Sequence, residues 1–358
     1  MPRLKPIQIG SISCYPLWFD SMGAKSSSLL IKTPDIAILV DPGAAEMQPS
    51  YPLPSSEKRR LRYQALQTIK EAAQEAEIVF ISHYHYDHHT LPSEAKEIYE
   101  GKKLWIKNPN LWINRSQWNR ARLFLSQLYE MKGEVLSSRL KPPEKIDLKD
   151  PLLDLPLASN KDFGDYRERK NELLTKGRGW FKALVKLWLN EPWVSQAEDV
   201  IFADGLDLKF GATKIKITSP LFHGAEYDRV GWVVGLVLEY GGRKILYSSD
   251  LQGPIIEDYA AWIIEEAPDV LFLDGPATYL LGYMLNQINL RRAIGNLCSI
   301  LKNTATSLII YDHHLLREAR FKERTAEAYQ VAKEEGKTLI TAAEWLGEPP
   351  LISKITKE

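Results

Sequence analysis

The stretch SHYHYDHH, residues 82–89, holds four of the seven histidines in this chain. It follows the apolar run IVFI, which is typical of a buried strand. Because side chains alternate along an extended chain, His83 and His85 point to the same side and can share a metal ion. Asp87 and His88 lie just beyond, where the chain turns and can direct them to an adjacent cation. The stretch therefore predicts a metal centre at the end of a strand.

Further ligand-type side chains follow three later predicted strands. A tetrahedral ion takes about four ligands, and a two-metal centre needs more. Because separate strand ends place residues of the same kind in the same kind of position, we expect these side chains to join the centre. They are His223, Asp250 and one of His313 and His314, with His314 preferred. His89 is interpreted as a structural or surface residue.

Composition and charge narrow the class of protein. The chain is 44% hydrophobic and 26% charged, which is typical of a globular domain with an ordinary core. Lys plus Arg and Asp plus Glu both number 46, so the formal net charge is zero. A protein that mainly grips nucleic acid usually carries a basic surplus, because phosphate contacts dominate its affinity. Nucleic-acid binding is therefore not favoured, although a local basic patch remains open.

The two cysteines, the start of the chain and the apolar runs indicate the cellular compartment in which the protein is expected. Cys14 and Cys298 have no spacing that suggests a thiolate metal site or a disulfide framework. The start of the chain, MPRLKP, is not followed by an uninterrupted apolar segment, so no signal peptide is expected. No apolar run reaches the length of a transmembrane helix. A cytoplasmic location is the default expectation.

The order of predicted elements suggests a single domain over residues 1–358. Strands fill the first forty residues, a helix covers Glu57–Glu75 with Ser55 or Ser56 as N-cap, and strands return from Val200. Gly241-Gly242 marks a hairpin. The last part alternates strands with helices, ending in a helix from Leu315 onward. Between the early strands and those that return at Val200, residues of about 101–198 are predicted to form a mainly helical insertion or cap.

That predicted insertion is rich in tryptophan and in basic residues. Such a surface can stack bases and contact phosphates, which favours a phosphodiesterase or nuclease. The simpler interpretation is that the tryptophans are core anchors and the lysines a solvated helix face. Trp180, Phe181, Leu184, Val185 and Trp188 have helical spacing, which suits packing against the domain or a subunit partner and, less readily, a lipid-like surface.

The pattern His-x-His-x-Asp-His at His83–His88 resembles the metallo-β-lactamase superfamily. Supporting segments are Leu39-Val40-Asp41-Pro42-Gly43, Phe222-His223-Gly224, Tyr247-Ser248-Ser249-Asp250 and the late histidines. Three further segments resemble a mainly prokaryotic branch of metal-dependent hydrolases, which refines the expected fold and says little about substrate. They are Ser249–Pro254, Asp274-Gly275-Pro276 and Asp312–Arg317.

The resemblance implies a four-layer αββα sandwich with two metals at one edge of the sheets. In that arrangement His83, His85 and His223 hold the first metal, and Asp87, His88 and His313 or His314 hold the second. Asp250 bridges both, while Asp41 supports the site from behind its ligands. Tyr279 and Arg317 stand near strand ends in family-like segments and are candidates for binding substrate.

Such a site implies a hydrolase. Two divalent cations lower the pKa of bound water toward ~7 and neutralise charge on the attacked group. Asp87 or Asp250 would orient the nucleophile or pass a proton to the leaving group. We expect hydrolysis of an ester, amide or phosphodiester, with a phosphodiester preferred.

Two other functions remain open at this point. The same ligands suit Zn, Mn and Fe, with Zn expected, so an iron-dependent oxidoreductase is the first alternative. A metal-containing binding or regulatory protein is the second. The expected partners are a small-molecule or phosphodiester substrate and a second copy of the chain in a homo-oligomer.

Overall fold

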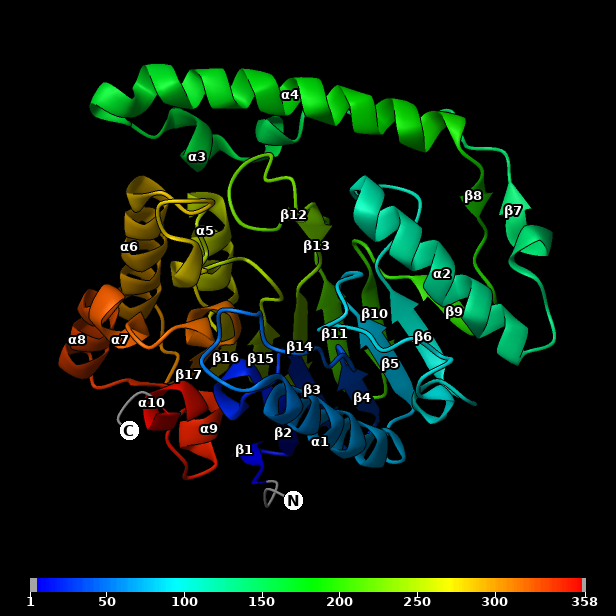
Figure 1. Ribbon diagram of the computed structural model, residues 1–358, viewed down its shortest axis with the longest axis horizontal. Helices are drawn as coiled ribbons and strands as arrows, with labels where there is room; N and C mark the ends of the chain where they lie inside the picture. The colour runs from blue at the N-terminus through cyan, green and yellow to red at the C-terminus, as the bar shows by residue number, and fades with distance from the viewer. Residues whose placement is uncertain (1–4, 356–358) are drawn as a thin grey trace.

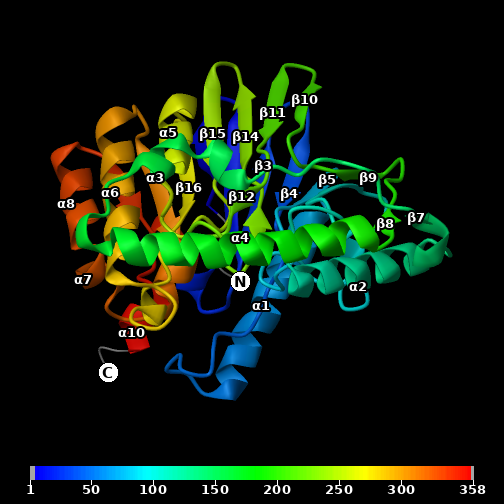
Figure 2. The same cartoon turned by 90° about the horizontal axis from the view of Figure 1, so that it is seen from above.

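The computed structural model describes residues 5–355, which fold into two facing seven-stranded sheets with helices outside them (Figures 1 and 2). The first sheet has the order β1 (Ile7–Ile9), β2 (Ile12–Phe19), β3 (Ser27–Lys32), β4 (Ala37–Val40), β5 (Ile78–Ile81), β6 (Lys103–Ile106), β9 (Val200–Phe202). The second has the order β10 (Asp207–Phe210), β11 (Thr213–Ile217), β14 (Leu236–Tyr240), β15 (Arg243–Tyr247), β16 (Val270–Asp274), β17 (Leu308–Asp312), β18 (Thr338–Ile340).

Helices cover the outer faces of both sheets, which gives the predicted αββα layers. The first sheet carries α1 (Ser55–Ala73) and α2 (Arg115–Met131); the second carries α5 (Glu257–Glu266), α6 (Gln287–Asn303) and α8 (Ala326–Glu334). The shorter helices are α3 (Pro156–Asn160), α7 (Phe321–Arg324), α9 (Ala342–Trp345) and α10 (Leu351–Ile355). No helix within residues 5–355 is long and apolar enough to cross a membrane.

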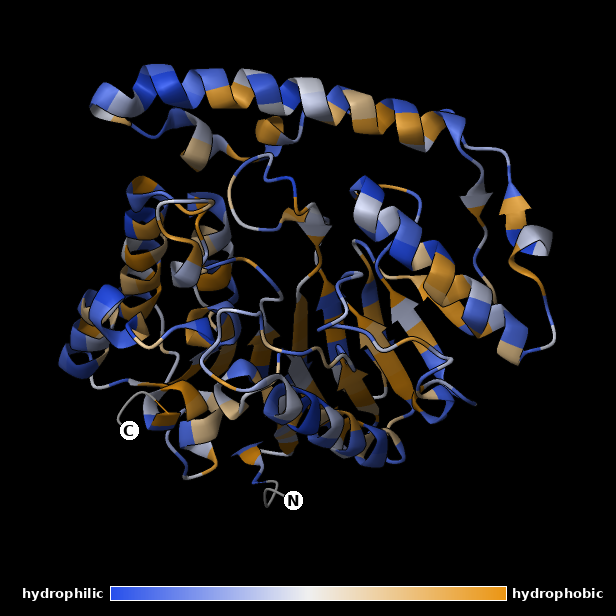
Figure 3. Cartoon of the chain, in the orientation of Figure 1, coloured by the Kyte–Doolittle hydropathy of each residue, from blue (hydrophilic) through white to orange (hydrophobic). Residues whose placement is uncertain are grey.

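Alternation along the strands builds two separate hydrophobic cores. In β4, Ile38 and Val40 pack between the sheets, while Leu39 packs against the outer helices. Strand β5 repeats the pattern, with Phe80 between the sheets and Val79 outside. Because every second side chain of a strand points the same way, strands buried on both faces read as continuous apolar runs. Figure 3 shows this apolar interior of the sheets.

Several predicted boundaries differ from the observed ones. Helix α1 begins at Ser55 after Pro54 at the N-cap, where Ser55 or Ser56 was expected to be the cap. The predicted terminal helix from Leu315 is wrong. The chain forms a 3-10 helix, η7 (His313–Arg317), and then short helices around β18. The reason is that Leu315 and Leu316 are both buried beside the strand ends, so this segment packs as a tight turn.

The segment predicted as a helical insertion begins with a strand of the first sheet. Strand β6 pairs in parallel with both β5 and β9. Its run of four residues is too short for periodicity to separate a strand from a piece of helix. The helical part starts at α2 and continues through α4 (Arg167–Asn190), and the ribbon β7 (Leu140–Lys141) with β8 (Trp193–Val194) leads back to the sheet.

Helix α4 crosses one end of the sheets above the hairpin of β12 (Leu221–Phe222) and β13 (Trp232–Val233) (Figure 1). Its aromatic side chains pack inward: Trp180 stacks on Trp232 at a centroid distance of 5.6 Å, and Trp188 is fully buried against Trp112. These tryptophans are core anchors and present no stacking surface for bases.

Candidate metal centre

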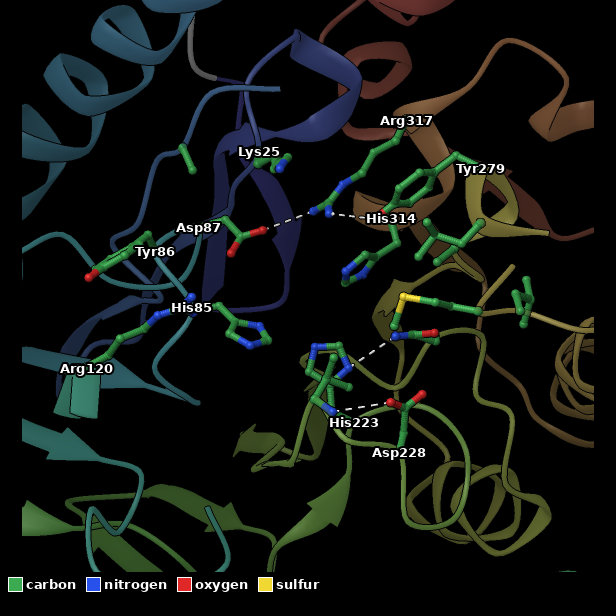
Figure 4. A pocket seen from close by; sticks show the side chains of 17 residues that line it. Lys25, His85, Tyr86, Asp87, Arg120, His223, Asp228, Tyr279, His314 and Arg317 are labelled. Carbon is green, nitrogen blue, oxygen red and sulfur yellow. Dashed lines mark hydrogen bonds and ion pairs between the residues drawn. The ribbon is translucent and has the colours of Figure 1, made fainter. Parts of the chain in front are cut away.

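The candidate ligands meet because the strands before them run in parallel. Strands β4 and β5 are parallel neighbours in one sheet, and β15, β16 and β17 are parallel neighbours in the other. Parallel strands end at the same edge, so the residues that follow them lie together. That edge gathers the stretch after β5, Asp250 after β15 and His313 after β17, and the β12–β13 hairpin adds His223. Figure 4 shows His85, Asp87 and His223 around the pocket beside them.

A first cluster joins His83, His85 and His223 to one oxygen of Asp250. His83 Nε2 lies 3.0 Å from His85 Nδ1 and 3.4 Å from Asp250 Oδ2, and His223 Nε2 lies 3.1 Å from the same oxygen. Ligands about 2.0–2.1 Å from a tetrahedral ion stand about 3.3–3.4 Å apart. The four atoms therefore have the spacing of one coordination sphere.

A second cluster joins Asp87, His88 and His313 to the other oxygen of Asp250. The Nε2 atoms of His88 and His313 lie 3.2 Å apart, and they stand 3.1 and 3.4 Å from Asp250 Oδ1. Asp87 Oδ2 is 3.8 Å from His313 Nε2. The two oxygens of Asp250 thus face one cluster each.

Buried atoms without partners fit a cation at this place. Both oxygens of Asp250 and Nε2 of His223 are buried and make no hydrogen bond within the described part of the chain. Burial holds the pKa of His83 and His85 well below its usual range, so both imidazoles are neutral, the form that binds metal. Burial opposes the charge of Asp250, but His88 and His313 hold the pKa of this carboxyl well below its usual range.

Asp41 lies behind the second cluster and is fully engaged by protein groups. One of its oxygens accepts hydrogen bonds from His88 Nδ1 and Tyr247 Oη, both at 2.7 Å, and the other accepts one from the Ser82 backbone amide. Burial lowers the pKa of His88, yet the charges of Asp250 and Asp41 raise it to about 10. The surroundings of His88 therefore favour positive charge, as a cation would supply.

Backbone strain gathers at the same edge. Asp41, Ser249 and His313 adopt the left-handed region with φ of 44°, 54° and 65°. Each such residue costs of order 1–3 kcal/mol and persists only where its surroundings hold it in place. The strain turns the side chains at the ends of β4, β15 and β17 toward one point.

A family model described as a beta-lactamase superfamily domain matches residues 24–286. The chain belongs to the β-lactamase superfamily. Among its relatives, UPF0282 protein MK0213 of Methanopyrus kandleri is 33% identical over 93% of each chain. UPF0282 protein MJ1629 of Methanocaldococcus jannaschii is 31% identical over 94% of this chain and 92% of its own.

Solved structures of the same fold are more distant. The metallo-beta-lactamase fold protein YhfI from Bacillus subtilis is 12% identical, covers 88% of both chains and has a TM-score of 0.38. Unliganded yeast PDE1 is 12% identical over 92% of this chain and 96% of its own, with a TM-score of 0.42. The family model confirms the predicted superfamily, and the two facing sheets with outer helices confirm its α/β fold.

The resemblance left open whether His313 or His314 joins the second cluster, and the two take different positions. His313, not the preferred His314, joins Asp87 and His88. His314 also belongs to the centre: its Nε2 is 4.0 Å from Asp250 Oδ2, and its Nδ1 is 3.0 Å from Asp274 Oδ1. The ring of His314 lines the open pocket, whereas His313 is fully buried.

Asp20 was not predicted as a site residue, yet it holds His313 and Arg317 in place. One of its oxygens lies 2.9 Å from His313 Nδ1, and the other accepts a hydrogen bond of 2.6 Å from Arg317 Nε. Burial raises the pKa of Asp20, but Arg317 and His313 hold it well below its usual range. Asp20 follows β2 directly, so the rule that found the other carboxylates, an acid after a strand, applies to it as well.

A pocket of about 330 Å³ opens onto the metal centre. Its wall includes His85, Asp87, His223 and His314 together with both predicted substrate candidates, Tyr279 and Arg317 (Figure 4). Arg317 is 6% exposed and donates to Asp20 and, over 3.0 Å, to Asp87. Its Nη1 also donates to Tyr279 Oη over 3.3 Å. Within the site, Arg317 is therefore already paired with two carboxylates, those of Asp20 and Asp87.

Proposed function

We propose that this superfamily member is a hydrolase that acts through two divalent cations. In this proposal His83, His85 and His223 hold the first cation, Asp87, His88 and His313 hold the second, and Asp250 bridges them. The observation that carries the proposal is the position of Asp250, whose two buried, unpaired oxygens face one cluster each. Imidazole and carboxylate ligands suit Zn, Mn and Fe, and Zn is proposed as the native metal.

When bound, the two cations would activate a water molecule and neutralise charge on the attacked group. Asp87 or Asp250 would orient that water or pass its proton to the leaving group, because both carboxylates belong to the candidate metal centre. Arg317 fixes Asp87 through a direct hydrogen bond. His314, held by Asp274 on one ring nitrogen, presents the other to the pocket and would contact the substrate.

The proposed substrate is a small ester, amide or phosphodiester, with the phosphodiester preferred. A pocket of about 330 Å³ falls at the lower end of the range for small-molecule sites. In α4, Trp188 is buried and Trp180 stacks on Trp232, so the structure does not support the base stacking that the sequence suggested. A small molecule therefore fits better than a nucleic-acid strand.

The proposal is tested by His85→Ala, with His89→Ala as a matched histidine control. His89 is buried next to the ligands but is absent from both clusters. We expect His85→Ala to lose metal-dependent turnover of bis-p-nitrophenyl phosphate, while His89→Ala keeps its bound metal. Circular dichroism checks that both variants fold. Unchanged turnover in folded His85→Ala protein would refute the proposed centre, and iron bound without turnover would point to redox chemistry.

A further inference from the structure

Three cationic side chains line the pocket: Lys25, Arg120 and Arg317. Arg317 is engaged by Asp20 and Asp87. Within residues 5–355, Lys25 and Arg120 form no ion pair with a carboxylate. Both are half-buried and line the pocket. Two cationic side chains without an ion-pair partner among the described residues thus border the metal centre.

The backbone around Lys25 is held firmly. Lys25 and Ala45 exchange two backbone hydrogen bonds of 2.9 Å, which pin the residue across a loop. Its neighbour Ser26 donates its amide to Asp20 over 2.9 Å, and the Ser26 carbonyl oxygen lies 3.1 Å from His313 Nδ1. The segment that carries Lys25 is therefore the same one that orients the second cluster, and the backbone of Lys25 is held beside it.

Arg120 of α2 lines the pocket near His85 and Tyr86 (Figure 4). Its guanidinium lies over the ring of Tyr86, with Cζ 4.8 Å from the ring centroid. Such stacking orients the group without neutralising its charge. From the same helix, Gln117 donates to the Val230 carbonyl oxygen over 2.6 Å, which ties α2 to the loop after His223. Helix α2 thus contributes directly to the pocket wall.

The acidic lining residues do not cancel these charges. Asp87 already pairs with Arg317 and belongs to the second cluster. Asp228 stands beside His223, on the wall opposite Lys25 (Figure 4). Cations without partners in a partly enclosed site attract anions, because the local dielectric is lower than that of water. The free positive charge is therefore concentrated on the side of the pocket where Lys25, His85 and Arg120 lie.

We propose that Lys25 and Arg120 form an anion subsite that selects a small phosphoester over neutral esters. This inference rests on the proposed hydrolase function. The phosphoryl oxygens would face Lys25 and Arg120 while the ester bond lies at the metal centre. Ammonium and guanidinium groups both recognise phosphate, the second in a planar, two-pronged geometry.

The test compares kcat/KM for anionic bis-p-nitrophenyl phosphate with that for neutral p-nitrophenyl acetate. We expect the ratio of the two to fall about tenfold or more in Lys25→Met and in Arg120→Met, because each variant loses a charge-assisted hydrogen bond. Lys182→Met removes a charge from the exposed side of α4 and should keep the ratio of the wild type. Lys25→Arg keeps the charge and should recover most of the selectivity. A ratio unchanged in both Met variants would overturn the subsite.

A second measurement separates this inference from the hydrolase proposal. Binding of inorganic phosphate is measured by calorimetry at matched metal content, with or without turnover. Weaker binding by about tenfold in Lys25→Met, together with no turnover of either ester by the wild type, would keep the anion subsite and refute the hydrolase. Equal phosphate binding in wild type, Lys25→Met and Arg120→Met would overturn the subsite even if the neutral ester is hydrolysed.

Discussion

Asp20 connects the second cluster to the residues behind it. Its two oxygens contact His313 and Arg317, and Arg317 in turn contacts Asp87. Groups that orient a metal ligand in this way are worth about 10–100-fold in metal affinity. One buried carboxylate therefore controls the direction of two proposed ligands.

We predict that Asp20→Asn weakens binding of the second metal about 10–100-fold, because the amide cannot hold both His313 and Arg317 as the carboxylate does. Metal titration followed by calorimetry measures this effect. The exposed Asp154→Asn variant serves as a control with the same chemical change. Equal affinity for both cations in Asp20→Asn would show that Asp20 does not support the site.

The two adjacent histidines should behave differently when removed. His313→Ala is predicted to reduce the bound metal from about two equivalents to about one, because His313 lies between Asp87 and His88. His314→Ala should keep both equivalents and lose turnover, since His314 faces the pocket. Elemental analysis of the two variants decides the point, and the reverse pattern would assign the ligand role to His314.

At the residue scale, the sequence predicted the direction of a side chain where a candidate ligand follows a regular strand. His83 and His85 come directly after β5, so alternation placed them correctly on one side. Alternation could not decide between His313 and His314, because the left-handed backbone of His313 breaks the alternation after β17. Asp20 and Asp274 also stand at strand ends, but neither was predicted to support the site, because the histidines that they contact are known only from the folded structure.

Helix α4 packs closely against the loop after His223 at one glycine, Gly177. A Cβ at Gly177 would lie 2.5 Å from the Cβ of Tyr227, whereas a Cβ at Gly179 would meet nothing within 4 Å. The same substitution at the two positions should therefore have opposite effects on stability.

Gly177→Ala is predicted to destabilise the protein by about 1–3 kcal/mol, because α4 must move away from Tyr227. Gly179→Ala should stabilise it by about 0.5–1 kcal/mol, because alanine is the better helix former on an exposed face. Urea unfolding of both variants measures the difference. If both changes stabilise the protein, α4 does not pack on this loop as described.

A buried ionic network ties four elements together beside the site. Arg292 of α6 donates to Glu226 in the loop after His223 and to Glu257 of α5, and Lys170 of α4 donates to Glu226. Burial raises the pKa of Glu226, but Arg292 and Lys170 lower it to about 2. Because this pKa lies below the usual value of about 4.3, the pairing stabilises the fold above pH 5 and is lost as the pH falls toward 2.

Glu226→Gln is predicted to cost about 3–5 kcal/mol at pH 7, since it leaves buried Arg292 with one carboxylate. The wild type should lose about 2 kcal/mol of its advantage over the variant between pH 5 and pH 2.5. Urea unfolding across that range tests both statements, with exposed Glu327→Gln as the control. A constant difference at all pH values would show that the charge of Glu226 is not responsible.

At the scale of elements, strands were predictable where a motif or a turn signal marks their end. Strand β5, which runs into the histidine stretch, and the Gly241-Gly242 hairpin between β14 and β15 lie where expected. Strands β6, β10 and β18 have three or four residues each and no such signal, and runs of this length are too short for periodicity. Their place is fixed by pairing with neighbouring strands, which a single sequence does not reveal.

The whole molecule combines a doubly layered core with one open edge. The facing sheets bury their shared side chains and leave the strand ends to build the site. The sequence motifs were sufficient to predict this architecture, because a ligand motif restricts the fold more strongly than composition does. They were not sufficient to predict how α4 packs across the end of the sheets, which depends on the aromatic contacts of Trp180 with Trp232 and Trp188 with Trp112.

The central claim is that the protein is a hydrolase that uses two divalent cations bound at this edge of the sheets. The direct measurement is the metal content of the purified protein, together with turnover of bis-p-nitrophenyl phosphate before and after chelation. We predict about two equivalents of zinc or manganese, loss of turnover on chelation and recovery when metal is restored. Protein that holds no metal, or turnover that survives complete removal of metal, would contradict the account.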